Sequence, residues 1–153
     1  MLDKYYLEEI QTELESLEII VKEISSILDD YSNVAPDIRA KTLLGSFLAQ
    51  FYMGVENILK KLVKATGQTL PKSENWHLEL FKSFCDPPTD NFPVLFDNDL
   101  ERKMANFRRF RHVVFHGYGF RLDWEIMLEG SSQLDDTFVK FKEKLKNYLE
   151  SEP

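Results

Sequence analysis

Apolar residues recur along most of the chain at spacings of three and four, the period at which one face of an α-helix repeats. This pattern predicts long amphipathic helices over residues 2–31, 37–65 and 97–116, and a closing helix from Leu134 to Leu149. The apolar positions that define these faces include Ile10, Leu17, Val21 and Ile24 in the first helix, Phe47, Phe51, Val55, Ile58 and Leu62 in the second, and Phe138, Phe141 and Leu145 in the last.

Local signals mark where these helices begin and end. Pro36 suits the first turn of the second helix, and Gly67 is placed to end it. Ser73 is a capping residue for a short helix that runs to about Phe84. Three prolines between residues 85 and 97 predict a loop, which leaves the acidic Asp97-Asn98-Asp99 stretch to cap the next helix.

The remaining segments complete an all-helical pattern. Residues 122–128 predict one helical turn, and Gly130-Ser-Ser predicts a break after it. No stretch alternates with period two for long enough to predict a strand, and there are no internal repeats. We therefore predict an all-α fold with a single domain over residues 1–153, an antiparallel bundle of four main helices plus one short helix.

The composition agrees with one aromatic-rich domain. The chain has 153 residues, 43% of them hydrophobic, with 12 Phe, 6 Tyr and 2 Trp, enough for a sizeable core. Cys85 is the only cysteine, which excludes an internal disulfide and a thiolate metal cluster and suits a reducing compartment. The N-terminal sequence has no uninterrupted apolar run, so we expect neither a signal peptide nor a membrane span, and a cytoplasmic location.

Charge is distributed unevenly along the chain. The formal net charge is −7, yet residues 102–121 contain six Arg or Lys and no Asp or Glu. Removing this +6 segment leaves −13 on the rest, so a basic surface is predicted on an otherwise acidic protein. Such a surface can attract nucleic acid that the remainder would repel.

An arginine falls among the core positions of this basic helix. With Phe107 at zero on a helical wheel, Leu100, Met104, Phe110, Val114 and Phe115 form the predicted apolar face, and Arg108, Arg109, His112 and His116 the opposite one. Arg111 lies at ~40°, inside the apolar sector, although a guanidinium is costly to desolvate. It either reaches a rim or pairs with an acid such as Glu56. Similarly, His116 is equally typical of a C-terminal cap, and His77, beside Trp76, of a structural residue.

The spacing Arg111, four residues, His116, one residue, Tyr118 resembles the signature of the HEPN superfamily, and in particular its HepT branch of toxins. The flanking FRRFRHVVFHGYGFRLDWE is similar to HepT-like proteins, as are the earlier YMGVENILKK and NWHLELF. This resemblance spans nearly the whole chain. It implies the toxin of a type VII-like toxin–antitoxin pair of the HepT/MntA kind, a metal-independent endoribonuclease with no cofactor.

The resemblance also implies residue roles. His116 would act as general base or acid, and Arg111 would hold the scissile phosphate and stabilise the transition state. His112, Arg108 and Arg109 would support RNA binding. Attack by the ribose 2′-oxygen would leave a 2′,3′-cyclic phosphate.

Two further implications concern partners. Residues five apart lie ~140° round a helix, so Arg111 and His116 do not naturally converge in one chain; a two-fold homodimer would bring two such helices to one cleft. By resemblance, Tyr118 would accept AMP from a cognate MntA-like nucleotidyltransferase antitoxin, which would block the cleft. On the residues alone, Tyr118 is as typical of a packed aromatic after Gly117. A larger complex with the antitoxin stays open.

Two other function classes remain. One is a non-catalytic HEPN module that binds a nucleotide or serves as the partner of the nucleotidyltransferase. The other is a helical oligomerisation protein whose basic helix docks on an acidic neighbour.

Overall fold

The computed structural model describes residues 2–89 and 91–151. Within these ranges the chain is all-helical, as predicted, and contains no β-strand beyond an isolated bridge between Cys85 and Phe96. The elements, in chain order, are α1 Lys4–Asp30, α2 Ile38–Ala65, α3 Trp76–Lys82, α4 Asn98–His116, the 3₁₀ helix η1 Gly119–Arg121, α5 Trp124–Ser132 and α6 Leu134–Ser151. That the whole of residues 1–153 forms one domain stays a prediction, since Met1, Asp90 and residues 152–153 lie outside the described residues.

Aspartates begin four of the helices. The Asp3, Asp37, Asp97 and Asp123 carboxylates each accept a hydrogen bond from a backbone N–H of the first turn, at 2.8–3.2 Å. Each of these carboxylates satisfies donors that have no partner inside the helix. Gly67, at φ +76°, follows α2 in the left-handed conformation that glycine adopts without strain, as predicted.

Three boundary predictions were wrong in detail. Pro36 lies outside α2, because Asp37 supplies the cap and the helix starts at Ile38. Ser73 lies before α3, and its hydroxyl donates to Glu79 at 2.7 Å instead of capping a backbone N–H. Gly130-Ser-Ser belongs to α5 rather than ending it, because Gly130 is buried where α5 meets the Phe110 ring of α4. The structure therefore has two short helices, α3 and α5, beside the four main ones.

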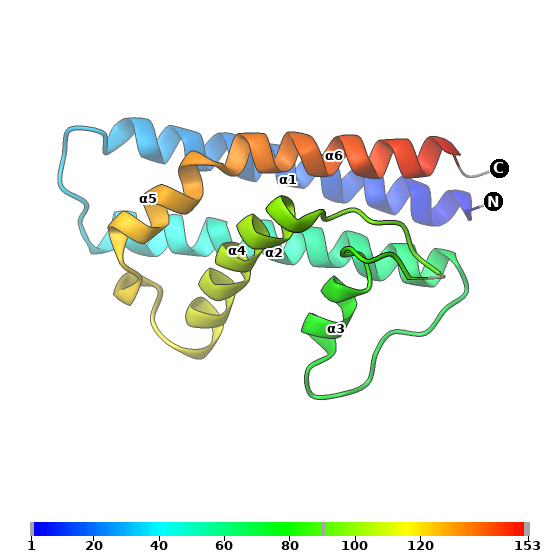
Figure 1. Cartoon of the computed structure of the whole chain (residues 1–153). Helices are drawn as coiled ribbons and strands as arrows, with labels where there is room; N and C mark the ends of the chain where they lie inside the picture. The colour runs from blue at the N-terminus through cyan, green and yellow to red at the C-terminus, as the bar shows by residue number, and fades with distance from the viewer. Residues whose placement is uncertain (1, 90, 152–153) are drawn as a thin grey trace.

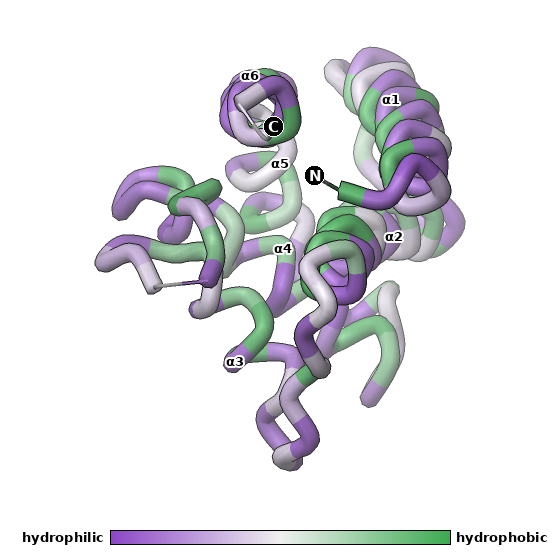
Figure 2. Tube along the Cα trace, turned by 90° about the vertical axis from the view of Figure 1, so that its right-hand side faces the viewer, coloured by the Kyte–Doolittle hydropathy of each residue, from purple (hydrophilic) through white to green (hydrophobic). Residues whose placement is uncertain are grey.

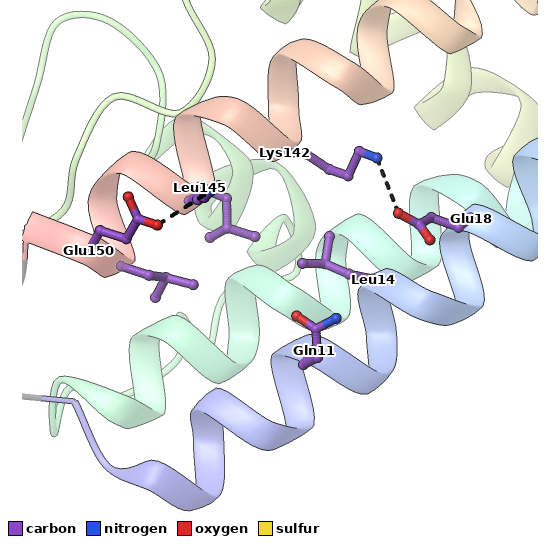
Figure 3. A pocket seen from close by; sticks show the side chains of 8 residues that line it. Gln11, Leu14, Glu18, Lys142, Leu145 and Glu150 are labelled. Atoms are coloured by element: carbon purple, nitrogen blue, oxygen red, sulfur yellow. Dashed lines mark hydrogen bonds and ion pairs between the residues drawn. The ribbon is translucent and has the colours of Figure 1, made fainter.

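Helix α2 has a central place among the four main helices. Figure 1 shows α1 and α2 running in opposite directions, α6 beside α1, and α4 crossing α2 obliquely. Figure 2 looks along α1, α2 and α6, whose hydrophobic positions turn toward the interior. At the surface between α1 and α6, the Lys142 ammonium lies 3.1 Å from Glu18, next to Leu14 and Leu145 (Figure 3).

Aromatic rings join the helices in the core. Phe51 of α2 packs edge-on against Phe107 of α4 and Phe138 of α6, with ring centroids 5.1 and 6.0 Å apart. Each of these rings is almost fully buried, so their contacts combine apolar burial with favourable ring geometry. This cluster sets where the basic helix α4 rests on the bundle.

The single cysteine belongs to this interior. Cys85 is buried, and its thiol donates to the backbone carbonyl of Phe81 at 3.4 Å. Burial raises the pKa of this thiol to about 12, so it stays protonated at neutral pH. Cys85 is therefore a small core residue and not a nucleophile.

No helix in the described part of the chain carries an apolar stretch sufficient to cross a bilayer.

Gly54 permits the closest approach between α1 and α2. A Cβ atom at this position would lie 3.0 Å from Cγ of Leu17, which is 1% exposed and has no room to move. Alanine normally stabilises a helix relative to glycine. Here we expect Gly54→Ala to lower the free energy of unfolding by about 1–3 kcal/mol, because the added methyl group overpacks the interface.

Urea denaturation checks this prediction. Gln50→Ala, at an exposed position of the same helix, serves as the control and should change stability by less than about 0.5 kcal/mol. If Gly54→Ala is as stable as the wild type, the interface between α1 and α2 can make room for the added methyl group.

Candidate functional site

A hollow of about 640 Å³ lies between the start of α3 and the second half of α4. We call it the α3–α4 hollow. Its α4 wall consists of Arg108, Arg111, His112, Phe115 and His116, and its α3 wall includes His77 and Leu78. The hollow therefore gathers two arginines and all three histidines of the chain, and these include four of the five α4 residues that the sequence predicted for the site.

Arg111 lines this hollow. Its side chain is half-buried, and its buried Nε has no hydrogen-bond partner among the described residues. It does not form the ion pair with Glu56 that the sequence left open, because Glu56 contacts His77 and Lys60 instead. The guanidinium lies over the Phe115 ring, 5.3 Å from its centroid. Arg111 thus reaches the rim with an unused donor.

Arg108 and Phe115 lie differently from the predicted helical wheel. Arg108 was expected on the outer face, but its Nη1 is buried without a partner and its guanidinium lies 5.6 Å from the Phe81 ring. Phe115 was expected in the core and is 54% exposed. The reason is tertiary, because the Phe81 ring of α3 lies against the Arg108 guanidinium, whereas Phe115 is left exposed.

Arg108 also borders a buried tyrosine. Burial raises the pKa of Tyr52 to about 12, although the positive charge of Arg108 acts in the opposite direction. The Tyr52 hydroxyl therefore stays neutral and cannot neutralise the arginine. The positive charge of Arg108 remains available to an anion in the hollow.

His112 and His116 stand side by side at the open edge. Their ring centroids are 4.6 Å apart, and both side chains are exposed. His116 is the last residue of α4, before Gly117.

The sequence predicted that Arg111 and His116 would not converge in one chain. Both residues line the same hollow of one chain. The Arg111 guanidinium lies over the ring of Phe115, the residue before His116.

Two predicted site residues lie outside the hollow. Arg109 is exposed on the other side of α4. Tyr118 follows α4 and is 64% exposed, so the alternative of a packed aromatic is wrong. Its ring stacks on Phe120 with centroids 5.6 Å apart, and the Arg121 guanidinium lies 5.8 Å from it. The phenol is thus accessible to another protein.

The sequence analysis missed one element of the hollow. His77, which was assigned a structural role, lines the wall opposite His116, and its Nδ1 lies 2.8 Å from a carboxylate oxygen of Glu56. The capping residue Ser73 and the HEPN-like NWHLELF stretch both pointed to this helix, but no local pattern links residues 56 and 77. Among the described residues, no three His, Cys, Asp or Glu side chains are grouped so as to share a metal ion.

Comparison with known proteins gives one match. A sequence model of the family described as "HepT-like protein" matches residues 43–151, a range that includes every residue lining the hollow. No curated protein and no solved structure matches the chain.

The buried Nε of Arg111, which has no hydrogen-bond partner, has a consequence for stability. A buried N–H without a partner loses its hydration and gains nothing in return. We expect Arg111→Met, which keeps the apolar stem and removes the charge, to raise the free energy of unfolding by about 1 kcal/mol. Urea denaturation measures this change.

Arg109→Met is the matched control, because Arg109 lies on the same helix and is exposed. It should shift stability by less than about 0.5 kcal/mol. If Arg111→Met is instead the less stable protein, then Arg111 has a stabilising partner within the fold.

Proposed function

The chain belongs to the HepT-like protein family, and on this premise we propose that it is the toxin of a type VII-like toxin–antitoxin pair that cleaves RNA without a metal ion. The family match agrees with the HEPN-like spacing of Arg111, His116 and Tyr118 in the sequence. One observation carries the proposal. The α3–α4 hollow combines guanidinium donors that have no protein partner with imidazoles that are open to solvent.

The unpartnered donors favour an anionic ligand. Arg108 and Arg111 each bury one nitrogen without a hydrogen bond, an arrangement that costs stability unless a ligand completes it. A phosphodiester offers two non-bridging oxygens that match the geometry of a guanidinium. Arg111 therefore holds the scissile phosphate and stabilises the charge that grows on it during attack.

The imidazoles supply proton transfer. Histidine titrates near neutral pH, so it can accept a proton from the ribose 2′-hydroxyl or donate one to the leaving 5′-oxygen. His116 takes part in this transfer, and His112, next to it, and Arg109 contact the RNA backbone. The expected products are a 2′,3′-cyclic phosphate and a 5′-hydroxyl.

A homodimer extends the basic surface. Two copies of residues 102–121 around a two-fold axis would present up to twelve Arg and Lys to one RNA strand. The exposed Phe115 at the edge of the hollow offers an apolar contact for the second copy. Each subunit still carries Arg111 and His116 in its own hollow.

Tyr118 is the proposed point of control. Its exposed phenol lies two residues beyond His116. Transfer of AMP to this oxygen by a cognate nucleotidyltransferase would add negative phosphates and a bulky nucleoside next to the hollow. These groups would repel and obstruct the RNA.

The first test removes the proposed catalytic groups. We expect Arg111→Ala to reduce the cleavage rate by about 10²–10³-fold and His116→Ala by about 10²–10⁴-fold, with growth toxicity lost in both. Denaturing gels of a defined RNA measure cleavage, and circular dichroism monitors folding. Lys146→Ala, on the exposed side of α6, is the control for a general loss of basic charge.

The ribonuclease proposal fails if the wild-type protein cuts no RNA while mass spectrometry shows Tyr118 to be unmodified. The non-catalytic alternative, a nucleotide-binding or partner module, would then take its place.

The second test concerns the control residue. Tyr118→Phe removes only the acceptor oxygen, so we expect full toxicity and no AMP adduct in the presence of the antitoxin and ATP. Intact-protein mass spectrometry and growth assays provide the readouts. Tyr5→Phe is a matched control, since Tyr5 is 61% exposed and lies on α1. Neutralisation of Tyr118→Phe through AMP on another residue would contradict the assignment.

A further inference from the structure

A buried carboxylate stands behind the α3 wall of the hollow. Glu56, on α2, is 4% exposed, and its Oε2 lies 2.8 Å from Nδ1 of His77. Its other oxygen lies 3.9 Å from the Lys60 ammonium. Helix α3 therefore docks on α2 through a charged residue in an otherwise apolar stretch.

A buried ion pair of this kind is unusual if its role is only to stabilise the fold. Withdrawing a carboxylate from water is expensive, and an apolar pair of similar volume commonly stabilises a protein at least as well. Glu56 contacts the one histidine that faces the hollow from the side opposite α4. The pair is thus placed where it can affect chemistry.

We propose that His77 is the general base of the RNA cleavage reaction and that Glu56 is the residue that positions it. The inference rests on the proposed ribonuclease function and adds a second acid–base group from α3 to it. His116 then acts as the general acid.

Glu56 determines the protonation pattern of the ring. An ionised carboxylate only accepts hydrogen bonds, so Nδ1 of His77 carries the proton and donates it to Glu56. The lone pair is then on Nε2, at the opposite edge of the ring. The side chain is 31% exposed and lines the hollow, so this edge is the part open to a ligand.

Neighbouring groups hold the plane of the ring. Trp76 packs against His77 with ring centroids 3.5 Å apart, and Lys60 covers the Trp76 ring at 4.7 Å. When His77 accepts a proton, the Glu56 carboxylate stabilises the imidazolium that forms. A fixed ring with a neutral Nε2 suits a general base.

His116 suits the complementary role. It is exposed at the end of α4, so solvent can protonate it before each turnover, and no carboxylate among the described residues contacts it. The Arg111 guanidinium binds the phosphate on which both histidines act. The hollow, about 640 Å³, has room for a phosphodiester and one ribose.

The reaction balances with these groups alone. Nε2 of His77 takes the proton of the 2′-hydroxyl as the 2′-oxygen forms a bond to phosphorus. The bond from phosphorus to the 5′-oxygen breaks, and that oxygen leaves with the proton of the His116 imidazolium. The products are a 2′,3′-cyclic phosphate and a 5′-hydroxyl. His77 ends protonated and His116 neutral, and exchange with solvent restores both.

A substrate with a sulfur leaving group separates the two roles. In RNA whose scissile 5′-oxygen is replaced by sulfur, the thiolate departs without a proton, so the acid becomes dispensable and the base does not. We expect His116→Ala to cleave this substrate at close to the wild-type rate. His77→Ala and His77→Asn should stay at least about 100-fold slower than wild type on both substrates.

The variants are chosen to exclude a structural explanation. His77→Asn retains an N–H donor near the Nδ1 position for Glu56 but has no basic nitrogen. Glu56→Gln should slow cleavage of both substrates at least about tenfold, because a glutamine can reverse the tautomer of His77. Ser73→Ala removes the 2.7 Å hydrogen bond that anchors the start of α3 outside the hollow, and should leave the rate unchanged.

Each outcome decides between the proposals. If wild-type protein cleaves and folded His77→Asn is equally fast, the His77 inference is overturned and the ribonuclease stands. If the sulfur-containing substrate restores the cleavage rate of the His77→Asn variant to that of the wild type, then His77 is the acid and the two roles are reversed. If the wild type cleaves neither substrate, both proposals fail.

Discussion

The structure depends on one constraint, the packing of most other elements against α2. This helix contacts α1, α3, α4, α5 and η1, and half of its residues are buried. Its buried face is almost entirely apolar, and Gly54 shows how tightly a neighbouring helix approaches. Helices α3 and α4 both contact α2, and the hollow lies between the start of α3 and the second half of α4.

The same constraint explains why the hollow combines burial with charge. Phe107 and Phe110 anchor α4 to the core, so the arginines on the adjacent flank cannot turn fully to solvent. Glu56 is the single charged residue that α2 buries among the described residues, and it faces this region. Apolar residues of similar volume in place of buried charged groups commonly make a protein at least as stable. The loss of stability at a site of this kind is typical of residues retained for function.

Helix positions could be predicted from the sequence because they follow from local rules. The 3–4 spacing of apolar residues located all four main helices, and the aspartate at residue 97 and Gly67 marked boundaries that the structure bears out. The family, too, was recognisable from the spacing of Arg111, His116 and Tyr118. Local rules failed at Gly130, where contact with Phe110 overrides the helix-breaking tendency of glycine.

The sequence by itself therefore determined the helices, the basic segment and the motif, since each depends on residues within a few turns of one another. Only the tertiary structure decided which way Arg108 and Phe115 point, because the answer depends on where α3 docks beside α4. It also decided the pairing of Glu56 with His77, which are 21 residues apart and on different helices. No periodicity encodes such a contact. It arises because a buried carboxylate must find a hydrogen-bond donor, and the packing of α3 on α2 supplies His77 as that donor.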